Sequence, residues 1–390
     1  MKNKVKIVVL CNDRFPSLSA HGVYLAKLCD SLSGAGAEVT LIVPKRFNEI
    51  AEDYRTFYNV KNNFKVVRIF SFDFIIFARF LKGLAYWLQY LNFYLFVFAY
   101  FLFSPRDRVI YTMDYFGPLL KLLGFKVVFE SHQGLGSHKA FWVRFVKLAD
   151  LLVVTNSYIA GLFTSFFSSE KILVARNGVD LKDFESDFDC ENFRRRTGLP
   201  LDRKIVSYIG KFRTMGKGKG VEELIEIFPK VFSSCPQAYL MIVGVSEDEK
   251  RELESILSQK SGVQAFDYKI VLQVSQQEIP NYLKASDILV MNYPNKEHYA
   301  YFMSPMKMFE YMASGRPIVS TDLPSIREVL ADSNAVLVQS ENIEDLTVGI
   351  LRVLNDHGLA EKISARAKKD VREYSWDKRA EKILNFIASR

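Results

Sequence analysis

Short apolar segments recur along this chain of 390 residues, and longer segments with helical periodicity separate most of them. The first series begins at Ile7–Cys11 and continues with EVTLIVP, KVVRIF, DRVIYTM, KVVFESH, DLLVVTNS and KILVARNG. The second series reads KIVSYIG, AYLMIVG, KIVLQVS, DILVMNYP, RPIVSTD and AVLVQS. Apolar strands that alternate with helices form parallel sheets covered on both faces. The pattern therefore predicts an α/β chain with two doubly wound domains in tandem.

A charged stretch, DLKDFESDFDCENFRRRTGLPLD, separates the two series. The pattern predicts it as a loop-like connection after a first domain that ends near Asp180. In open sheets of this kind, ligands bind beyond the carboxyl ends of the strands. Two facing sheets also create a cleft between domains. We therefore expect the functional residues in the loops that follow the strands.

Composition excludes several classes of protein and leaves the partner open. Apolar residues make up 49% and charged residues 25%, which excludes disordered and coiled-coil chains. A net charge of +8 favours an anionic partner, namely nucleic acid, a phosphorylated small molecule or an acidic membrane surface. The four cysteines are far apart in sequence, so neither a disulfide scaffold nor a zinc site is expected. The first apolar run is too short for a signal peptide, which predicts a cytoplasmic protein.

One segment, residues 83–103, interrupts the strand and helix pattern. It reads GLAYWLQYLNFYLFVFAYFLF and carries no formal charge. Its length permits a membrane span. However, it lies between two strands of one predicted sheet, contains Gln89 and Asn92, and is rich in Tyr and Trp, which prefer membrane interfaces. The sequence favours a buried or membrane-surface helix, with a span as the alternative, and Arg79 and Lys82 precede it at positions suited to lipid phosphates.

The segment SPMKMFEYMASGRPIV, residues 304–319, predicts a short helix from Pro305 to Ser314. Ser304 suits the N-cap, Pro305 the first turn and Gly315 the end. A helix that starts at the carboxyl edge of a sheet offers free N–H groups to a phosphate. Glu310 lies within this helix, where it can either accept hydrogen bonds from a ribose or simply be solvated.

The first strand of the second domain runs into YIGKFRTMGKGKGVEEL. Gly210 lets the chain leave the strand sharply, and Lys211, Arg213, Lys217 and Lys219 follow before the next helix. Glycines beside cations suit the binding of a diphosphate, although a basic surface loop has the same composition. The segment is not a Walker loop, and GxGxxG follows the first strand of neither domain.

Two histidines of the first domain also follow predicted strands. His21 and Gly22 come directly before a helix predicted from Val23 to Ser33, and Glu130 and His132 lie in VVFESHQG. A single histidine in such a place is usually a surface or capping residue. Two at the same edge of one sheet make a functional role more plausible. The sequence shows no GxSxG elbow and no metal or hydride-transfer signature.

The chain resembles the retaining glycosyltransferases of family four. The similar pieces are AHG at 20–22, ADLLVVTNS, ARNGVD at 175–180, YIGKF with the following Lys219 and Gly220, SPMKMFEYMASGRPIV, and the YSW near the C-terminus. The resemblance implies a GT-B fold, in which two Rossmann-like domains face each other across an interdomain cleft. It assigns residues 1–180 to an acceptor-side domain and residues 181–372 to a sugar-nucleotide domain. Residues 373–390, with an apolar stripe from Trp376 to Ile387, would form a helix that crosses back to the first domain.

The same resemblance implies roles for single residues. His132 would lie near the transferring sugar as the catalytic residue. The residues expected to bind the donor are Gly22, Lys211, Arg213, Lys219, Ser304, Met306, Lys307 and Glu310. Two departures from the family pattern stand out. The first glutamate of the usual E-x7-E pair falls at Phe302, with Glu297 and His298 as nearby substitutes, and the loop from Lys211 to Lys219 is longer than expected.

These features predict a metal-independent retaining glycosyltransferase with a nucleotide-sugar donor as substrate and no cofactor. The expected acceptor is an envelope glycan or a lipid-linked saccharide, because the aromatic helix can rest on a membrane. Nucleic acid is not an expected partner, and the expected location is cytoplasmic and peripheral, on the inner face of the membrane. The alternatives are a sugar-nucleotide epimerase on the same fold and an inactive sugar-nucleotide-binding partner protein, which the Phe302 departure keeps open.

Overall fold

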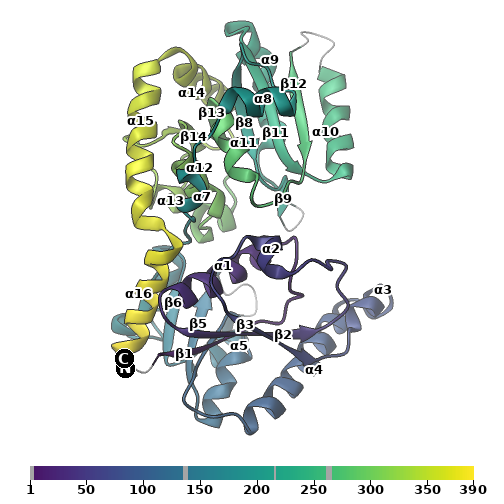
Figure 1. The fold of residues 1–390 in the computed structure, drawn as a ribbon, viewed down its shortest axis with the longest axis vertical. Helices are drawn as coiled ribbons and strands as arrows, with labels where there is room; N and C mark the ends of the chain where they lie inside the picture. Colours follow the sequence, from purple (N-terminus) through teal and green to yellow (C-terminus); the bar gives the residue numbers. More distant parts are fainter. Residues whose placement is uncertain (1–3, 135–138, 215–216, 261–265) are drawn as a thin grey trace. The chain divides into compact units, whose positions relative to one another are not determined.

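A computed structural model of the chain describes residues 4–134, 139–214, 217–260 and 266–390 (Figure 1). The chain forms two compact units. The first unit contains Met1–Arg176 together with Trp376–Arg390, and the second contains Asn177–Ser375. The chain therefore leaves the first unit once and returns to it after the second.

The first unit is built on a sheet of seven parallel strands in the order β3-β2-β1-β4-β5-β6-β7. The strands are β1 Lys6–Leu10, β2 Glu38–Lys45, β3 Lys65–Phe70, β4 Val109–Thr112, β5 Lys126–Ser131, β6 Leu151–Val154 and β7 Ile172–Val174. Strands β1, β5 and β6 are almost wholly buried, as apolar strands covered on both faces must be. The strand order reverses beside β1, so β1 and β4 mark the switch point where ligands bind in such sheets.

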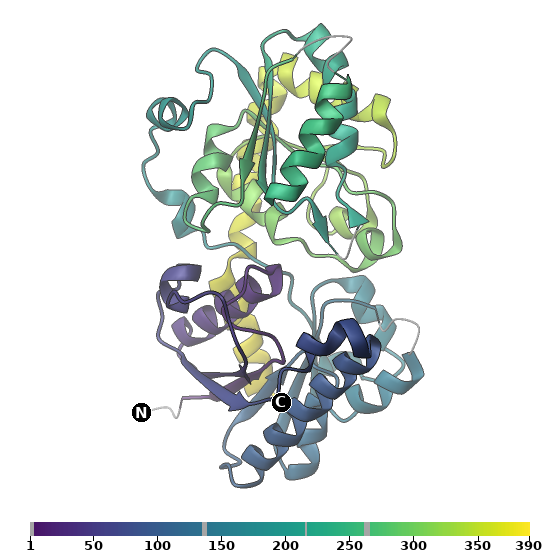
Figure 2. The ribbon, with the colours of Figure 1, turned by 90° about the vertical axis from the view of Figure 1, so that its right-hand side faces the viewer.

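Helices cover both faces of this sheet, with α1 on one side and α4 and α5 on the other (Figures 1 and 2). The helical elements are α1 Ala20–Gly34, α2 Tyr54–Tyr58, η1 Phe74–Phe77, α3 Ala78–Leu81, α4 Gly83–Leu102, η2 Gly117–Leu123, α5 Lys139–Val146, α6 Ser157–Phe163, η3 Ser169–Lys171 and α16 Trp376–Ala388. Helix α16 comes from the far end of the chain and packs on α1. Its apolar stripe, which includes Trp376, Ala380, Ile383 and Ile387, is buried there.

The second unit has a sheet of six parallel strands in the order β12-β11-β8-β13-β14-β15. The strands are β8 Lys204–Ile209, β11 Ala238–Val245, β12 Tyr268–Leu272, β13 Ile288–Met291, β14 Ile318–Thr321 and β15 Val336–Val338, with a small hairpin of β9 Arg213–Thr214 and β10 Lys217–Gly218. Its helices are α7 Lys182–Glu185, α8 Cys190–Thr197, α9 Val221–Ser234, α10 Glu247–Lys260, α11 Ile279–Ala285, η4 His298–Phe302, α12 Met306–Ser314, α13 Pro324–Arg327, α14 Ile343–Asn355, α15 His357–Asp370 and η5 Val371–Tyr374.

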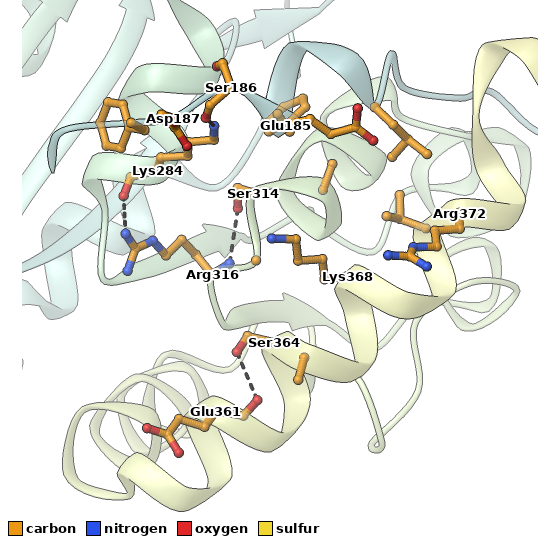
Figure 3. A pocket seen from close by; sticks show the side chains of 17 residues that line it. Glu185, Ser186, Asp187, Lys284, Ser314, Arg316, Glu361, Ser364, Lys368 and Arg372 are labelled. Carbon is orange, nitrogen blue, oxygen red and sulfur yellow. Dashed lines mark hydrogen bonds between the residues drawn. The ribbon is translucent and has the colours of Figure 1, made fainter.

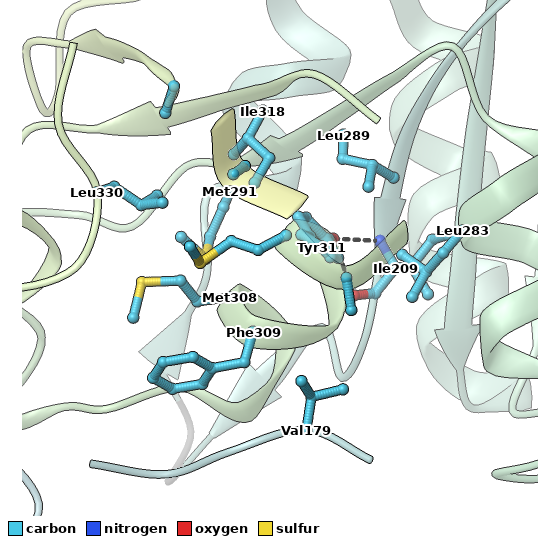
Figure 4. Packing of buried hydrophobic residues seen from close by; sticks show 14 of the residues in the cluster. Val179, Ile209, Leu283, Leu289, Met291, Met308, Phe309, Tyr311, Ile318 and Leu330 are labelled. Carbon is cyan, nitrogen blue, oxygen red and sulfur yellow. Dashed lines mark hydrogen bonds between the residues drawn. The ribbon is translucent and has the colours of Figure 1, made fainter. Parts of the chain in front are cut away.

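Alternate residues of β8 face two separate cores, one on each side of this sheet. Ile205 and Ile209 pack into one cluster, and Val206 and Tyr208 pack into the other. Figure 4 shows the first cluster around Tyr311 of α12. The hydroxyl of Tyr311 accepts a hydrogen bond from the backbone N–H of Ile209 at 2.9 Å and donates one to its carbonyl at 3.0 Å. This pair of bonds fixes α12 against the carboxyl end of β8.

The two parallel α/β sheets confirm the predicted fold class. The stretch that follows Asp180 differs from the prediction, because it is not a plain connecting loop. It contains α7 and α8, and Phe184 and Phe193 from these helices are buried in the core of the second unit. Charged residues dominate the stretch, so the few apolar side chains that anchor it are difficult to see in the sequence.

Candidate functional site

The carboxyl edge of the second sheet has a switch point between β8 and β13, where the strand order reverses. Gly210 follows β8 and Asn292 follows β13. Gly220, which precedes α9, has a φ of 77° and lies so close to Asn292 that an added Cβ would be 1.7 Å from its carbonyl oxygen. The loop that starts at Lys211 therefore returns against the end of β13 and places Lys219 at this edge.

Helix α12 begins beside the same edge, but its first turn differs from the prediction. Pro305 is the N-cap, and no side chain caps the helix. Ser304 is not the cap, because its hydroxyl and carbonyl accept hydrogen bonds from the backbone and side chain of Asn177 at 3.2 and 2.6 Å. Met306 and Lys307 thus form an uncapped helix start, which suits an anion.

The side chain of Lys307 is buried, with 9% of its surface exposed. Its ammonium group makes no hydrogen bond with the described residues and lies 3.7 Å from the ring centroid of Tyr208 and 5.6 Å from that of Tyr293. Gly210, with a φ of 137°, leaves room for it, because an added Cβ there would be 3.0 Å from the Cε of Lys307. Burial and the nearby Lys219 hold the pKa of Lys307 well below its ordinary value.

Lys219 and Lys211 add two further cations to this edge. Burial, followed by the charge of Lys211, lowers the pKa of Lys219 to about 8, and burial also lowers the pKa of Lys211. Neither ammonium group has an ion-pair partner among residues 4–134, 139–214, 217–260 and 266–390. The structure therefore brings Lys211, Lys219 and Lys307 together as a group of cations, which we call the cation group.

Arg213 does not belong to the cation group. Its guanidinium is paired with Glu252 at 2.5 Å and with Glu222 at 3.5 Å. These side-chain hydrogen bonds raise the pKa of Arg213 and lower that of Glu252. The side chain of Lys217 lies outside the described part of the chain. The extra length of the loop is taken up by the hairpin of β9 and β10, which sequence periodicity could not show because each strand has only two residues.

Glu310 lies in α12, one turn after Lys307, and is half-buried. Its carboxylate acts on the pKa of Lys307 in the upward direction, so the two side chains are electrostatically coupled. Phe302 is the last residue of η4, a turn of π-helix that also contains His298. Glu297, which precedes this turn, is exposed. Such turns often mark functional sites.

The carboxyl edge of the first sheet carries His21 and Gly22, which lie inside the first turn of α1 and not before it. Ser19 is the N-cap, and its hydroxyl accepts a hydrogen bond from the N–H of Gly22 at 2.9 Å. A Cβ on Gly22 would lie 2.5 Å from the hydroxyl of Tyr58, so this position needs glycine. Nδ1 of His21 pairs with the carboxylate of Asp13 at 2.5 Å, and this contact raises the pKa of His21 in spite of burial.

His132 is held by a buried carboxylate at the end of β5. Its Nε2 is 2.9 Å from Oε1 of Glu130, and its ring meets the ring of Tyr24 edge-on at 4.5 Å. Glu130 also accepts hydrogen bonds from the hydroxyls of Tyr24 and Tyr111 and pairs with Arg379 of α16. Burial raises the pKa of Glu130, but Arg379 and then His132 outweigh it and hold the value at about 2.

Arg379 is the functional candidate that sequence reasoning missed. Its side chain is 3% exposed, and its Nε also donates to the carbonyls of Ala175 and Arg176 at 3.3 and 3.1 Å. Arg379 and Glu130 are 249 residues apart. In the sequence, Arg379 is one of several charges in an amphipathic helix, and only the apolar stripe of that helix is a readable signal.

Cys11, Asp13 and His21 form a group that the sequence spacing did not reveal, with ligand atoms within 4.8 Å of one another. Burial and then the charges of Asp13 and Asp114 raise the pKa of the Cys11 thiol well above its ordinary value. A metal ion binds the thiolate, and His21 already uses Nδ1 to contact Asp13. The chemistry of the three residues therefore favours a hydrogen-bonded His21–Asp13 pair beside a neutral thiol over a metal site.

Two cavities lie away from the cation group. In the second unit, a cavity of about 810 Å³ opens beside the carboxyl end of α12, at Ser314 and Arg316, and Lys368 extends toward its middle (Figure 3). Its lining mixes acidic and basic side chains. In the first unit, a cavity of about 320 Å³ is lined by Arg14, Arg46 and Arg68 and also by Glu52 and Asp53.

The Nε of Arg46 is buried without a hydrogen-bond partner in the described structure. Burial lowers the pKa of this side chain to about 10. Its other nitrogens donate to the carbonyl and side chain of Asn12. Arg46 therefore keeps one buried donor without a partner among the described residues, in a side chain that also lines the cavity of the first unit.

Helix α4 occupies the apolar segment 83–103, whose length permits a membrane span. Among the described residues, no helix is both long enough and apolar enough to cross a bilayer. Gln89 and Tyr94 are among its buried residues, which places the polar groups of the helix against the first unit.

Comparison with known proteins finds a family match and several relatives. Residues 189–370 match the family described as glycosyl transferases group 1. An uncharacterised glycosyltransferase of Methanocaldococcus jannaschii is 31% identical over 223 residues, which cover 55% of this chain and 53% of that protein. The phosphatidyl-myo-inositol mannosyltransferase of Mycolicibacterium smegmatis is 27% identical over 202 residues, which cover 51% of this chain and 47% of that protein.

The chain thus spans about half the length of these curated relatives. Among solved structures, the Anabaena protein HepE in complex with UDP and glucose is similar over 99% of this chain and 100% of its own, with a TM-score of 0.71 and 15% identity. That likeness concerns the fold, whereas the family match concerns the sequence of the second unit. Residues 189–370, within the second unit, thus match the group 1 glycosyl transferases in sequence, and the chain as a whole is similar to HepE in fold.

Proposed function

We propose that the protein is a retaining glycosyltransferase of family four that takes its sugar from a nucleotide-activated donor and needs no metal ion. The observation that carries the donor assignment is the ammonium group of Lys307, which is buried beside Lys219 and makes no hydrogen bond with the described residues. A buried cation costs several kcal/mol unless an anion accompanies it. The diphosphate of a nucleotide sugar supplies that anion, and the UDP held by HepE, a protein of the same fold, supports this assignment.

The chemistry follows from where charge develops. The bond between the anomeric carbon and the phosphate oxygen breaks, and a bond to an acceptor hydroxyl oxygen forms on the same face of the sugar. The proton of that hydroxyl passes to the leaving diphosphate. Lys211, Lys219 and the uncapped start of α12 stabilise the negative charge of the leaving group, which is usually the largest catalytic contribution such a site makes. Glu310 would bind the ribose of the donor.

His132 is the proposed catalytic residue of the first unit. Its Nε2 lies against Glu130, which orients the ring and leaves Nδ1 for a sugar hydroxyl. Gly22 would let the backbone of α1 approach the donor phosphates. In this proposal the cation group of the second unit binds the donor diphosphate, and His132 of the first unit acts on the transferred sugar.

The acceptor we propose is an envelope glycan or a lipid-linked saccharide. The three arginines of the first-unit cavity, which outnumber its acidic residues Glu52 and Asp53, support an anionic group on that acceptor, because arginine binds phosphate and carboxylate through paired hydrogen bonds. The mycobacterial relative is an enzyme named for a phospholipid, which fits the same class. We accordingly place the protein at the inner face of a membrane as a peripheral protein.

The test is donor binding by variants of the cation group. A panel of sugar nucleotides is first screened by thermal shift, and affinities for the nucleotide that binds are then measured by calorimetry. We expect Lys219→Ala and Glu310→Ala each to lose roughly 1.5 to 3 kcal/mol of binding free energy. Lys230→Ala, a change of an exposed lysine on α9, is the matched control and should leave affinity unchanged.

Lys307→Met separates binding from folding. Removal of a buried amine that makes no hydrogen bond with the described residues should raise the melting temperature of the free protein while it weakens donor binding. Equal affinity in the parent protein and all three site variants would remove the cation group from the donor site. Turnover assays then separate the alternatives, since an epimerase converts the donor without an acceptor and an inactive partner protein converts nothing.

A further inference from the structure

Exposed apolar side chains are concentrated in one part of the first unit. Among the described residues, more than half of the large apolar side chains that are exposed lie between Phe70 and Phe103. Isolated exposed apolar residues are normal, but a contiguous group marks a surface that contacts something apolar. Most of this group belongs to α4 and to the short elements η1 and α3 just before it.

Helix α4 is apolar on two opposite faces. The inner face, at a spacing of four residues, includes Ala85, Phe93, Val97 and Phe101 and is buried against the first unit. The opposite face consists of Leu84, Trp87, Leu91, Leu95 and Leu102, which are 55%, 43%, 51%, 67% and 53% exposed. We call these five residues the outer stripe. A helix that is apolar on opposite faces is normally buried on both, whereas the outer stripe is exposed, with Trp142 as an aromatic neighbour of Trp87.

Polar contacts fix which face of α4 points outward. The side-chain oxygen of Gln89 accepts a hydrogen bond from the N–H of Phe74 at 2.6 Å. The amide of Asn92 donates to Ser71 at 2.8 Å, and the hydroxyl of Tyr94 donates to the carboxylate of Asp114 at 3.0 Å. Rotation of the helix would break all three contacts. The outer stripe is therefore a fixed feature of the folded unit.

Cations accompany the apolar surface, and acids do not. Residues 74–105 contain Arg79 and Lys82 and no Asp or Glu. Both cations are exposed, and Phe80 beside them is 79% exposed. The indole of Trp87 also stacks on that of Trp142 at 5.6 Å, which extends the aromatic surface to α5. Aromatic and aliphatic groups flanked by cations match the interface of an anionic bilayer.

We propose that the outer stripe binds the surface of an anionic lipid bilayer, with α4 lying in the plane of the interface. The leucines and Trp87 enter the boundary between headgroups and acyl chains, while Arg79 and Lys82 contact lipid phosphates. A second copy of this chain explains the cations less well, because the outer stripe offers no acidic group to pair with them. The proposal concerns binding alone, so it stands or falls independently of the transferase activity.

The test is sedimentation of the full chain with vesicles of phosphatidylcholine containing about a third phosphatidylglycerol. We expect binding that falls several-fold when salt is raised from 0.1 to 0.5 M, because screened charges contribute to it. Leu91→Gln with Leu95→Gln should reduce binding at least tenfold, and Arg79→Gln with Lys82→Gln should remove the preference for the anionic lipid. Ile343→Gln with Val348→Gln, two exposed positions of α14, is the matched control and should bind like the parent.

A second readout detects insertion directly. Lipids brominated in their acyl chains should quench the fluorescence of the parent protein more than that of Trp87→Phe. Melting temperatures show whether each variant is folded, so a loss of binding without a loss of folding supports the proposal. Absence of vesicle binding at both salt concentrations overturns it. A dimer in the absence of lipid that the Leu91→Gln with Leu95→Gln variant converts to monomer, without vesicle binding by the parent, also overturns it and assigns the stripe to a second copy.

Discussion

Lys219 is a residue whose charge depends on its ligand. Burial and Lys211 lower its pKa to about 8 in the free protein. A diphosphate favours the ammonium form, so binding raises this pKa. The contribution of Lys219 to the proposed donor affinity should therefore be complete well below pH 8. It should fall as the pH rises through 8, by up to tenfold per pH unit until the pKa of the complex is reached.

Calorimetry between pH 7 and 9.5 checks this expectation by measuring the affinity at each pH. A comparison of two buffers with different ionisation enthalpies also gives the number of protons taken up on binding. Lys219→Arg keeps its charge throughout this range and should show a much flatter profile. A parent affinity that is constant up to pH 9.5 would contradict the assignment of Lys219 to the diphosphate.

At the scale of elements, sequence periodicity predicted the strands of both sheets and the helices that have one apolar face. Strands buried on both faces and helices with one apolar face have clear patterns, so every strand of the two parallel sheets was foreseen. The start of α12 was placed one residue early because Ser304, a good cap by type, is occupied by Asn177. Such a contact joins residues that are far apart in sequence, so it cannot be predicted from the local propensity of Ser304.

Helix α16 contributes Arg379 to the polar cluster around Glu130 in the first unit. The buried pair of Arg379 and Glu130 predicts strong non-additivity, since either change alone leaves an uncompensated charge. We expect Arg379→Met and Glu130→Gln each to lower the free energy of unfolding by roughly 3 to 5 kcal/mol. The double variant should lose clearly less than the sum.

Urea unfolding of the parent, the two single variants and the double variant measures the coupling energy between Arg379 and Glu130. Lys382→Met, an exposed change on the same helix, is the control for substitution as such and should be close to neutral. Additive losses in the double variant would show that the pair contributes no coupling energy.

At the scale of the molecule, the two units differ in how the chain builds them. The second unit, Asn177–Ser375, is continuous in sequence, whereas the first is assembled from two separate segments. We therefore expect residues 177–375, expressed alone, to fold and bind the donor nucleotide. Residues 4–176 alone should fold poorly, because α1 loses the helix that packs on it.

Circular dichroism and thermal melting of the two fragments check this. Addition of a peptide of residues 376–390 should restore part of the helix content and the cooperative melting of fragment 4–176. A fragment 4–176 as cooperative and stable as the intact unit would show that α16 is dispensable for folding.

The return of the chain to its first unit has a consequence for synthesis on the ribosome. Glu130 and its cationic partner are separated by 249 residues, which a ribosome adds in roughly 10 to 50 s. During that interval Glu130 lacks the guanidinium group that pairs with it in the folded unit, while the second unit can already fold as it emerges. The first unit, most of which is synthesised before the second, is therefore completed only after it. The incomplete first unit must remain protected from misfolding until α16 is synthesised.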